Sequence, residues 1–136
     1  MSDQNCIFCR IAAGEIPSAT LFEDEKFRVI LDVGPAAKGH TLILPKKHYA
    51  NIMEMPPELV GEAFRLAKKA AEKQAEVLGC DGVNVLQNNG EAAGQTVFHF
   101  HIHVIPRFKG DKVSVGWKPG TLSDADKEEL IQSLSL

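Results

Sequence analysis

The stretch "VFHFHIHVIP", residues 97–106, alternates three histidines with bulky apolar residues. Successive side chains of a β-strand point to opposite faces, so His99, His101 and His103 are expected on one face, about 6.6 Å from neighbour to neighbour. The apolar residues are expected on the opposite, core-packed face: Phe98, Phe100, Ile102 and Val104. We predict one long strand over residues 95–108.

Three interpretations of the histidines are open at this point. Three buried structural histidines would each need a hydrogen-bond partner of their own. One metal ion held by all three is excluded, because the outer pair would stand about 13 Å apart and Zn–N bonds are about 2.0–2.1 Å. Two neighbours could still share an ion with ligands from elsewhere. Alternatively, a neutral imidazole attacks phosphorus while flanking histidines hold the phosphate oxygens.

The segment upstream, "NNGEAAGQT" at residues 88–96, brings Asn88, Gln95 and Thr96 to the start of this strand. Backbone N–H groups in such a turn can cradle an anion, although an ordinary hairpin loop has the same composition. A second glycine segment, "GPAAKGHT" at residues 34–41, nearly matches a phosphate-binding loop. We reject it, because His40 replaces the required lysine and a strand follows in place of a helix.

Composition limits the class of protein. The chain has 136 residues, with 15 Lys+Arg, 18 Asp+Glu and a formal net charge of -3. One domain is expected, and nucleic acid is not expected as a partner because no excess of positive charge is present. No apolar run approaches the roughly 18 residues of a membrane span, so no membrane association is expected either. The polar start and the odd number of cysteines favour a reducing, cytoplasmic location.

Hydrophobic patterning predicts an α+β fold. Residues 19–31 read as two antiparallel strands joined by the charged turn "EDEK", and residues 39–49 as a further short strand ended or edged by Pro45. The best helix runs over residues 57–78, with a proline at its start and Gly79 placed to close it. Residues 82–90 read as a strand followed by a turn, and a short helix follows Ser123.

The motif H-φ-H-φ-H-φ-φ at residues 99–105 resembles that of the histidine triad (HIT) family of nucleotide hydrolases and transferases. Residues 6–32, 39–52 and 88–107 also resemble HIT segments, in the family's order. The resemblance implies a single HIT domain over residues 1–136, with a motif-bearing core at 6–108 and a C-terminal tail at 109–136. It also implies an antiparallel five-stranded sheet, one long helix, a short C-terminal helix and a homodimer.

By resemblance, the chain attacks the α-phosphate of a purine nucleotide and forms a nucleotidyl-histidine intermediate. His101 would be the nucleophile, with His99 and His103 orienting it and contacting phosphate. The remaining assignments concern the substrate pocket: Gln95 and Thr96 near the scissile bond, Asn88 on phosphate oxygens, Asp32 on the ribose hydroxyls, and Ile7, Phe8 and Ile11 around the base. His103 stands where hexose-phosphate uridylyltransferases typically carry Gln, which favours hydrolases.

Two substrate classes fit this hydrolase, namely nucleoside phosphoramidates and dinucleoside polyphosphates, and both would release a nucleoside monophosphate. No cofactor is required for the chemistry. The alternative function is a zinc-stabilised nucleotide-binding or sensor protein with little turnover.

Cys6 and Cys9 form a C-x2-C pair that needs two more ligands to hold zinc. The candidates are His40, His48 and one histidine of the triad. HIT members with this pair imply a structural zinc held by Cys6, Cys9, His48 and His99. Two reduced cysteines packed beside the base pocket are the alternative.

Overall fold

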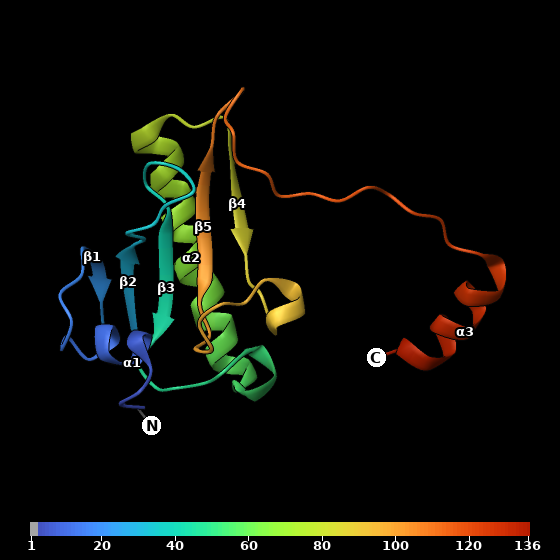
Figure 1. The fold of residues 1–136 in the computed structure, drawn as a ribbon, viewed down its shortest axis with the longest axis horizontal. Helices are drawn as coiled ribbons and strands as arrows, with labels where there is room; N and C mark the ends of the chain where they lie inside the picture. The colour runs from blue at the N-terminus through green and yellow to red at the C-terminus, as the bar shows by residue number, and fades with distance from the viewer. Residues whose placement is uncertain (1–2) are drawn as a thin grey trace.

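The computed structural model describes residues 3–136, which contain one antiparallel sheet of five strands in the order β1-β2-β3-β5-β4 (Figure 1). This confirms the predicted α+β class and the five-stranded sheet. The strands are β1 (Thr20–Glu23), β2 (Phe27–Leu31), β3 (Thr41–Pro45), β4 (Gly82–Leu86) and β5 (Ile102–Arg107). The helices are α1 (Ile7–Ala12), α2 (Pro57–Leu78), α3 (Asp124–Leu134) and two 3-10 turns, η1 (Ile52–Glu54) and η2 (Glu91–Ala93).

The sheet is covered by a different helix on each face. The long helix α2 packs over β3, β4 and β5, and the main core lies between them around Phe27, Ile43 and Phe100. The short helix α1 covers the other face, where Phe8 and Ile11 pack on Ile30, Leu42 and Leu44. Helix α2 begins at the predicted proline and is capped after Leu78 by Gly79, whose φ of 61° is left-handed. His99 and His101 lie on the face that α1 covers, where their rings contact Phe8.

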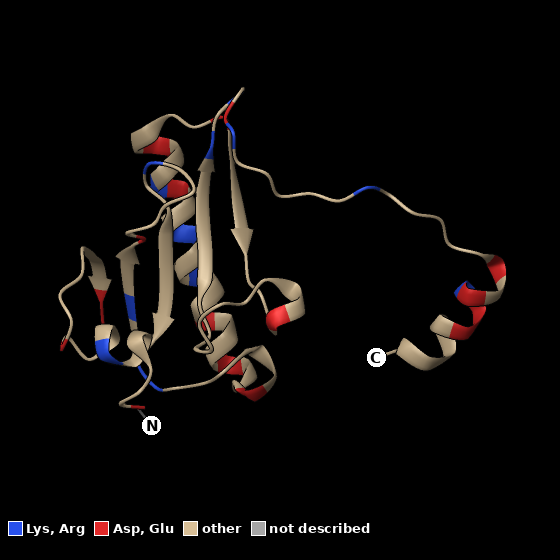
Figure 2. Ribbon diagram, viewed as in Figure 1, with Lys and Arg blue, Asp and Glu red and all other residues tan. Residues whose placement is uncertain are grey.

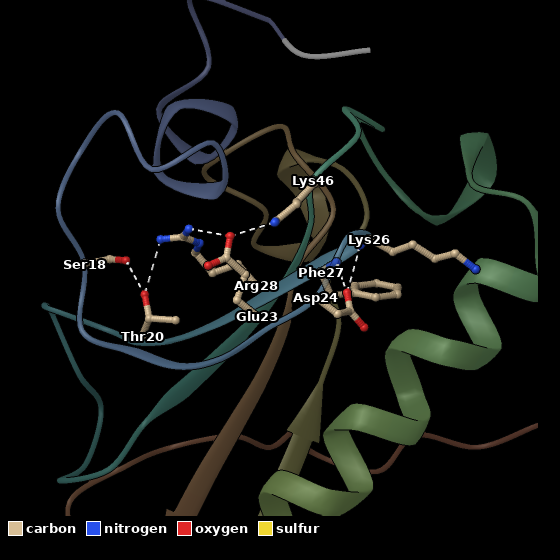
Figure 3. A network of polar contacts seen from close by, with 8 residues as sticks. All are labelled: Ser18, Thr20, Glu23, Asp24, Lys26, Phe27, Arg28 and Lys46. Carbon is tan, nitrogen blue, oxygen red and sulfur yellow. Dashed lines mark hydrogen bonds and ion pairs between the residues drawn. The ribbon is translucent and has the colours of Figure 1, made fainter.

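The predicted turn between β1 and β2 is held by Asp24, whose carboxylate accepts the backbone N–H groups of Lys26 at 2.8 Å and Phe27 at 2.7 Å. Beside it, one carboxylate oxygen of Glu23 accepts from Arg28 and from Lys46, both at 2.6 Å (Figure 3). The two cations hold the pKa of Glu23 below its ordinary value. These contacts tie the outer hairpin to the end of β3.

The turn that leads into β3 is fastened from α2. The side-chain amide of buried Gln74 donates to the carbonyl oxygens of Gly39 and Val104, both at 3.0 Å. Gly39 has a φ of +98°, and a Cβ there would lie 2.7 Å from Cδ1 of Leu78. A glycine is therefore required where the chain passes under the end of α2. The next residue, His40, is fixed in place by this turn.

The predicted strand over residues 95–108 is too long, because β5 begins only at Ile102. Upstream of it, the N–H of Phe100 donates to the carbonyl of Tyr49 at 2.6 Å, and the carbonyl of His99 faces the ring of His101. The pairing of β3 with β5 stops at Ile43 and Ile102, so these groups have partners outside the ladder. Phe98 is 50% exposed and does not join the core, whereas Phe100, Ile102 and Val104 are buried as predicted.

The chain after β5 leaves the sheet as an extended segment and ends in α3, which stands away from the rest of the protein (Figure 1). The hydroxyl of Ser123 accepts the N–H of Asp126 at 3.1 Å, which confirms the predicted cap of this helix. Its first half is acidic (Figure 2), and Ile131 and Leu134 are 61% and 67% exposed. Among residues 3–136, no helix is long and apolar enough to cross a membrane.

Candidate functional site

The first part of the site is a group of four side chains from three separate segments. Cys6 caps the N-terminus of α1, Cys9 follows within that helix, His48 lies after β3, and His99 precedes β5. Their ligand atoms all lie within 4.8 Å of one another. The structure thus brings together all four residues of the predicted metal site, and α1 is the element that delivers both sulfurs.

The spacing of the four atoms suits a tetrahedral ion. The Sγ of Cys9 lies 3.2 Å from Nδ1 of His48 and 3.4 Å from Nδ1 of His99, and Sγ of Cys6 also lies 3.4 Å from the latter. Zinc with bonds of about 2.3 Å to sulfur and 2.0–2.1 Å to nitrogen would hold S and N atoms about 3.6 Å apart. The residues therefore fit zinc with only slight movement.

His99 is prepared for this role by its second nitrogen. Nε2 lies 2.8 Å from the carbonyl oxygen of Pro45, which can only accept, so Nε2 carries the proton and Nδ1 offers a lone pair to the thiols. Burial lowers the pKa of His99 to about 4, and burial also raises the pKa of the Cys9 thiol to about 11. A bound cation would reverse the second effect by stabilising the thiolate.

The second part of the site is centred on His101, which is 6% exposed. Its Nδ1 lies 2.7 Å from the carbonyl oxygen of His99 and must donate to it, so Nε2 keeps an unprotonated lone pair. Burial lowers the pKa of His101, which keeps the ring neutral near pH 7. The ring of Phe8 lies edge-on at 4.9 Å between centroids. His101 thus has the tautomer and protonation state of a nucleophile.

His103 lies beside it, with 4.8 Å between ring centroids, and contacts a residue that the sequence did not single out for this site. Nδ1 of His103 is 2.9 Å from Nε2 of His40, and that nitrogen is 3.6 Å from Oδ2 of Asp32. Burial, with the neighbouring histidines His101 and His40, lowers the pKa of His103 to about 4. The predicted nucleophile and the predicted ribose ligand Asp32 therefore border one site.

The predicted base-pocket residues all lie on α1, although the sequence did not predict that helix. Phe8 and Ile11 are half-buried against the sheet, whereas Ile7 is 51% exposed. In the upstream loop, Asn88 is half-buried and Thr96 is exposed. Gln95 is 2% exposed. Its side-chain amide oxygen accepts the N–H of Gly90 at 2.8 Å, and its amide nitrogen donates to the carbonyl of Ala50 at 2.6 Å. It fixes the loop from inside.

His40 is the residue that sequence reasoning missed here. The sequence indicated it only as a possible zinc ligand and as part of the rejected phosphate loop. Its pairing with His103 joins residues 63 positions apart. The available signal for this contact was the position of His40 directly before β3. Strand β3 pairs with β5 so that Leu42 lies opposite His103, which brings His40 close to His103.

Comparison with known proteins identifies the family. The model of the HIT domain matches residues 13–110, which is more than half of the chain. The chain belongs to the HIT family. The protein hit of Bacillus subtilis is 46% identical over 133 residues, covering 97% of this chain and 90% of that protein. The adenosine 5'-monophosphoramidase of Saccharomyces cerevisiae is 43% identical over 126 residues, covering 92% of this chain and 77% of that enzyme.

Solved structures agree with this HIT fold. The crystal structure of a HIT family member from Bacillus subtilis has a TM-score of 0.90 at 42% identity, covering 97% of this chain and 96% of that one. A histidine triad family protein from Mycobacterium smegmatis has a TM-score of 0.77 at 40% identity, with 95% and 91% of the two chains covered. That structure is described as zinc-bound.

Proposed function

We propose that this HIT protein is a nucleotide hydrolase that acts through His101 on a nucleoside phosphoramidate or a dinucleoside polyphosphate. The observation that carries the proposal is the 2.7 Å contact between Nδ1 of His101 and the carbonyl of His99, which leaves the lone pair on Nε2. A relative that covers most of this chain bears the name of an adenosine monophosphoramidase, which supports hydrolysis at the level of the family.

In the proposed reaction, Nε2 of His101 forms a bond to the α-phosphorus while the bond from phosphorus to the leaving group breaks. The leaving amine takes a proton from solvent as it departs, whereas a leaving nucleotide departs as a phosphate anion. Water then attacks the same phosphorus and gives a proton back to solvent, the N–P bond breaks, and a nucleoside monophosphate is released. His101 returns neutral, with its proton still on Nδ1.

The neighbouring side chains supply binding and orientation. We assign His103, Asn88 and Thr96 to the phosphate oxygens, and Asp32 to the ribose hydroxyls. The purine base would pack on α1 through Ile7, Phe8 and Ile11. Gln95 would act by holding the loop, since its amide is already bonded within it.

We assign structural zinc to Cys6, Cys9, His48 and His99, as the donor set and its spacing support. Bound zinc would hold α1 against the segment that carries His99, whose carbonyl fixes the tautomer of His101. It would take no part in the reaction. Thiolate ligands need a reducing compartment, so we place the protein in the cytoplasm.

We further propose a homodimer. Strand β4 is an edge strand in the described sheet, because it pairs only with β5, and its Val85 is 44% exposed. An unpaired edge with apolar side chains is a ready surface for a second copy. The exposed apolar residues of α3 offer a second contact on the same partner.

The test is a turnover screen with adenosine and guanosine phosphoramidates and with dinucleoside tri- and tetraphosphates. The variant His101→Ala is expected to lose about 10^3-fold or more in kcat, while calorimetry still detects binding of the nucleoside monophosphate. Cys80→Ala is the matched control at a position remote from the triad in sequence. Unchanged turnover in His101→Ala would refute the nucleophile. Nucleotide binding without turnover in the wild type would favour the binding or sensor protein.

A further inference from the structure

His40 directly precedes β3, and its side chain is only 5% exposed. The backbone N–H of Ala36 points at Nδ1 of His40 from 2.9 Å. A backbone N–H can only donate, so Nδ1 must be the accepting nitrogen of the ring. In a neutral imidazole the single proton then lies on Nε2. Burial lowers the pKa of His40, so the neutral form prevails near pH 7.

The proton on Nε2 of His40 determines the tautomer of His103. Nε2 lies 2.9 Å from Nδ1 of His103, so it donates and that nitrogen accepts. The single proton of neutral His103 is therefore on its own Nε2. Oδ2 of Asp32, 3.6 Å from Nε2 of His40, favours the same arrangement because a carboxylate stabilises a proton facing it.

We propose that His40 is a positioning residue that holds the proton of neutral His103 on Nε2, so that His103 presents an N–H donor to the phosphate of a bound nucleotide. The inference rests on the proposed function for its consequence in catalysis, but the tautomer of His103 is a property of the protein alone. The result is a pair of neighbouring rings with opposite roles. Nε2 of His101 offers a lone pair to phosphorus, and Nε2 of His103 offers a proton to an oxygen.

The same three side chains could instead suggest a second metal site, since ligand atoms of Asp32, His40 and His103 lie within 4.8 Å of one another. The hydrogen bond from Ala36 argues against it. A metal would need the lone pair of Nε2 of His40, which moves the ring proton to Nδ1. That proton would then face the N–H of Ala36 at 2.9 Å, donor against donor.

The backbone around His40 keeps the ring from turning away. Its N–H donates to the carbonyl of Ala37 at 3.0 Å, and its carbonyl accepts from the N–H of Asp32 at 2.9 Å. Gln74 holds the preceding residue from α2. His40 can hold the proton of His103 only if its own ring stays in place. The backbone hydrogen bonds on both sides of His40 fix that position.

The direct measurement is long-range 1H–15N correlation spectroscopy of uniformly 15N-labelled, zinc-supplemented protein near pH 7.5, which distinguishes protonated from unprotonated ring nitrogens. We expect protons on Nε2 of His40, Nε2 of His103 and Nδ1 of His101. A proton on Nδ1 of His103 in the wild type would overturn the proposal, and this measurement requires no variant.

Two variants test the link between the rings. His40→Gln keeps an N–H group near the position of Nε2, whereas His40→Phe keeps a flat ring without a donor. We expect Nδ1 of His103 to keep its hydrogen-bonded resonance in the first variant and to shift in the second.

Kinetics with the same pair separate positioning from folding. We expect kcat to fall roughly tenfold in His40→Phe with a smaller change in KM, and to recover in His40→Gln. An unchanged His103 resonance in folded His40→Phe would overturn the proposal, as would equal kcat losses in both variants. If the wild type turns over no nucleotide, the proposed function fails while the tautomer assignment is still decided by the spectrum.

Discussion

The substitution Gly39→Ala tests the turn that places His40 and can be worked out from the structure. Gly39 has a φ of +98°, and a Cβ there would lie 2.7 Å from Cδ1 of Leu78 and 3.6 Å from Cγ of Pro106. Two costs therefore add, one from the backbone conformation and one from the close contact. Leu78 is the last residue of α2, so a rotation of its side chain can relieve part of the close contact.

The conformational cost for a residue with a Cβ is about 1–2 kcal/mol, and it is at the upper end here because +98° lies beyond the left-handed minimum near +60°. The contact adds about 1 kcal/mol, the lower end of the usual cost of overpacking. We expect the free energy of unfolding to fall by about 3 kcal/mol. The measurement is equilibrium urea unfolding followed by circular dichroism at fixed protein and zinc concentrations.

Two glycines of the same chain provide matched controls. Gly79 has a φ of +61° with nothing within 4 Å of its added Cβ, so Gly79→Ala measures the conformational cost alone, at about 1 kcal/mol. Gly61 lies within α2, and nothing lies within 4 Å of its added Cβ. Gly61→Ala should stabilise by about 0.5–1 kcal/mol. If Gly39→Ala costs no more than Gly79→Ala, the close approach to Leu78 is refuted.

Three further predictions concern the metal, the histidines and the assembly. Cys9→Ser should abolish stoichiometric zinc, measured by plasma emission spectrometry on purified protein, while Cys80→Ser should keep it; a zinc-free wild type would contradict the site. Because the folded pKa of His103 is about 4 and the unfolded pKa about 6.5, the unfolded chain binds more protons between these values, so the free energy of unfolding should fall as pH drops from about 6.5 to 4. The slope of the free energy of unfolding against pH should be shallower in His103→Asn, and equal slopes in the variant and the wild type would refute this prediction. Deleting residues 109–136 should weaken the homodimer in sedimentation experiments, and a monomeric full-length chain would contradict the dimer itself.

Much of the fold was predictable because its signals are local. The alternation in residues 97–106 placed Phe100, Ile102 and Val104 on the core face, as the structure confirms. The proline at position 57 and Gly79 marked the ends of α2, and the charged stretch at residues 23–26 marked the tight turn after β1. Each of these features depends on residues within a few positions of one another.

The errors arose where distant segments compete for backbone groups. The length of β5 was overestimated because the N–H of Phe100 bonds to Tyr49, which lies far away in the sequence. Helix α1 was not predicted, because only six residues form it and it is held mainly by packing on Leu42 and Leu44. Periodicity cannot indicate a helix of that length.

The sequence by itself determined the family, the antiparallel sheet and the set of candidate site residues. Only the tertiary structure decided that His99 faces the cysteines, that His101 and His103 lie together, and that His40 stands behind them. The reason is physical. A neutral imidazole has two nitrogens and one proton, which lies on the nitrogen that meets an acceptor and is absent from the nitrogen that meets a donor. Pro45 accepts from His99 and His40 donates to His103, and only folding brings these partners within 3 Å.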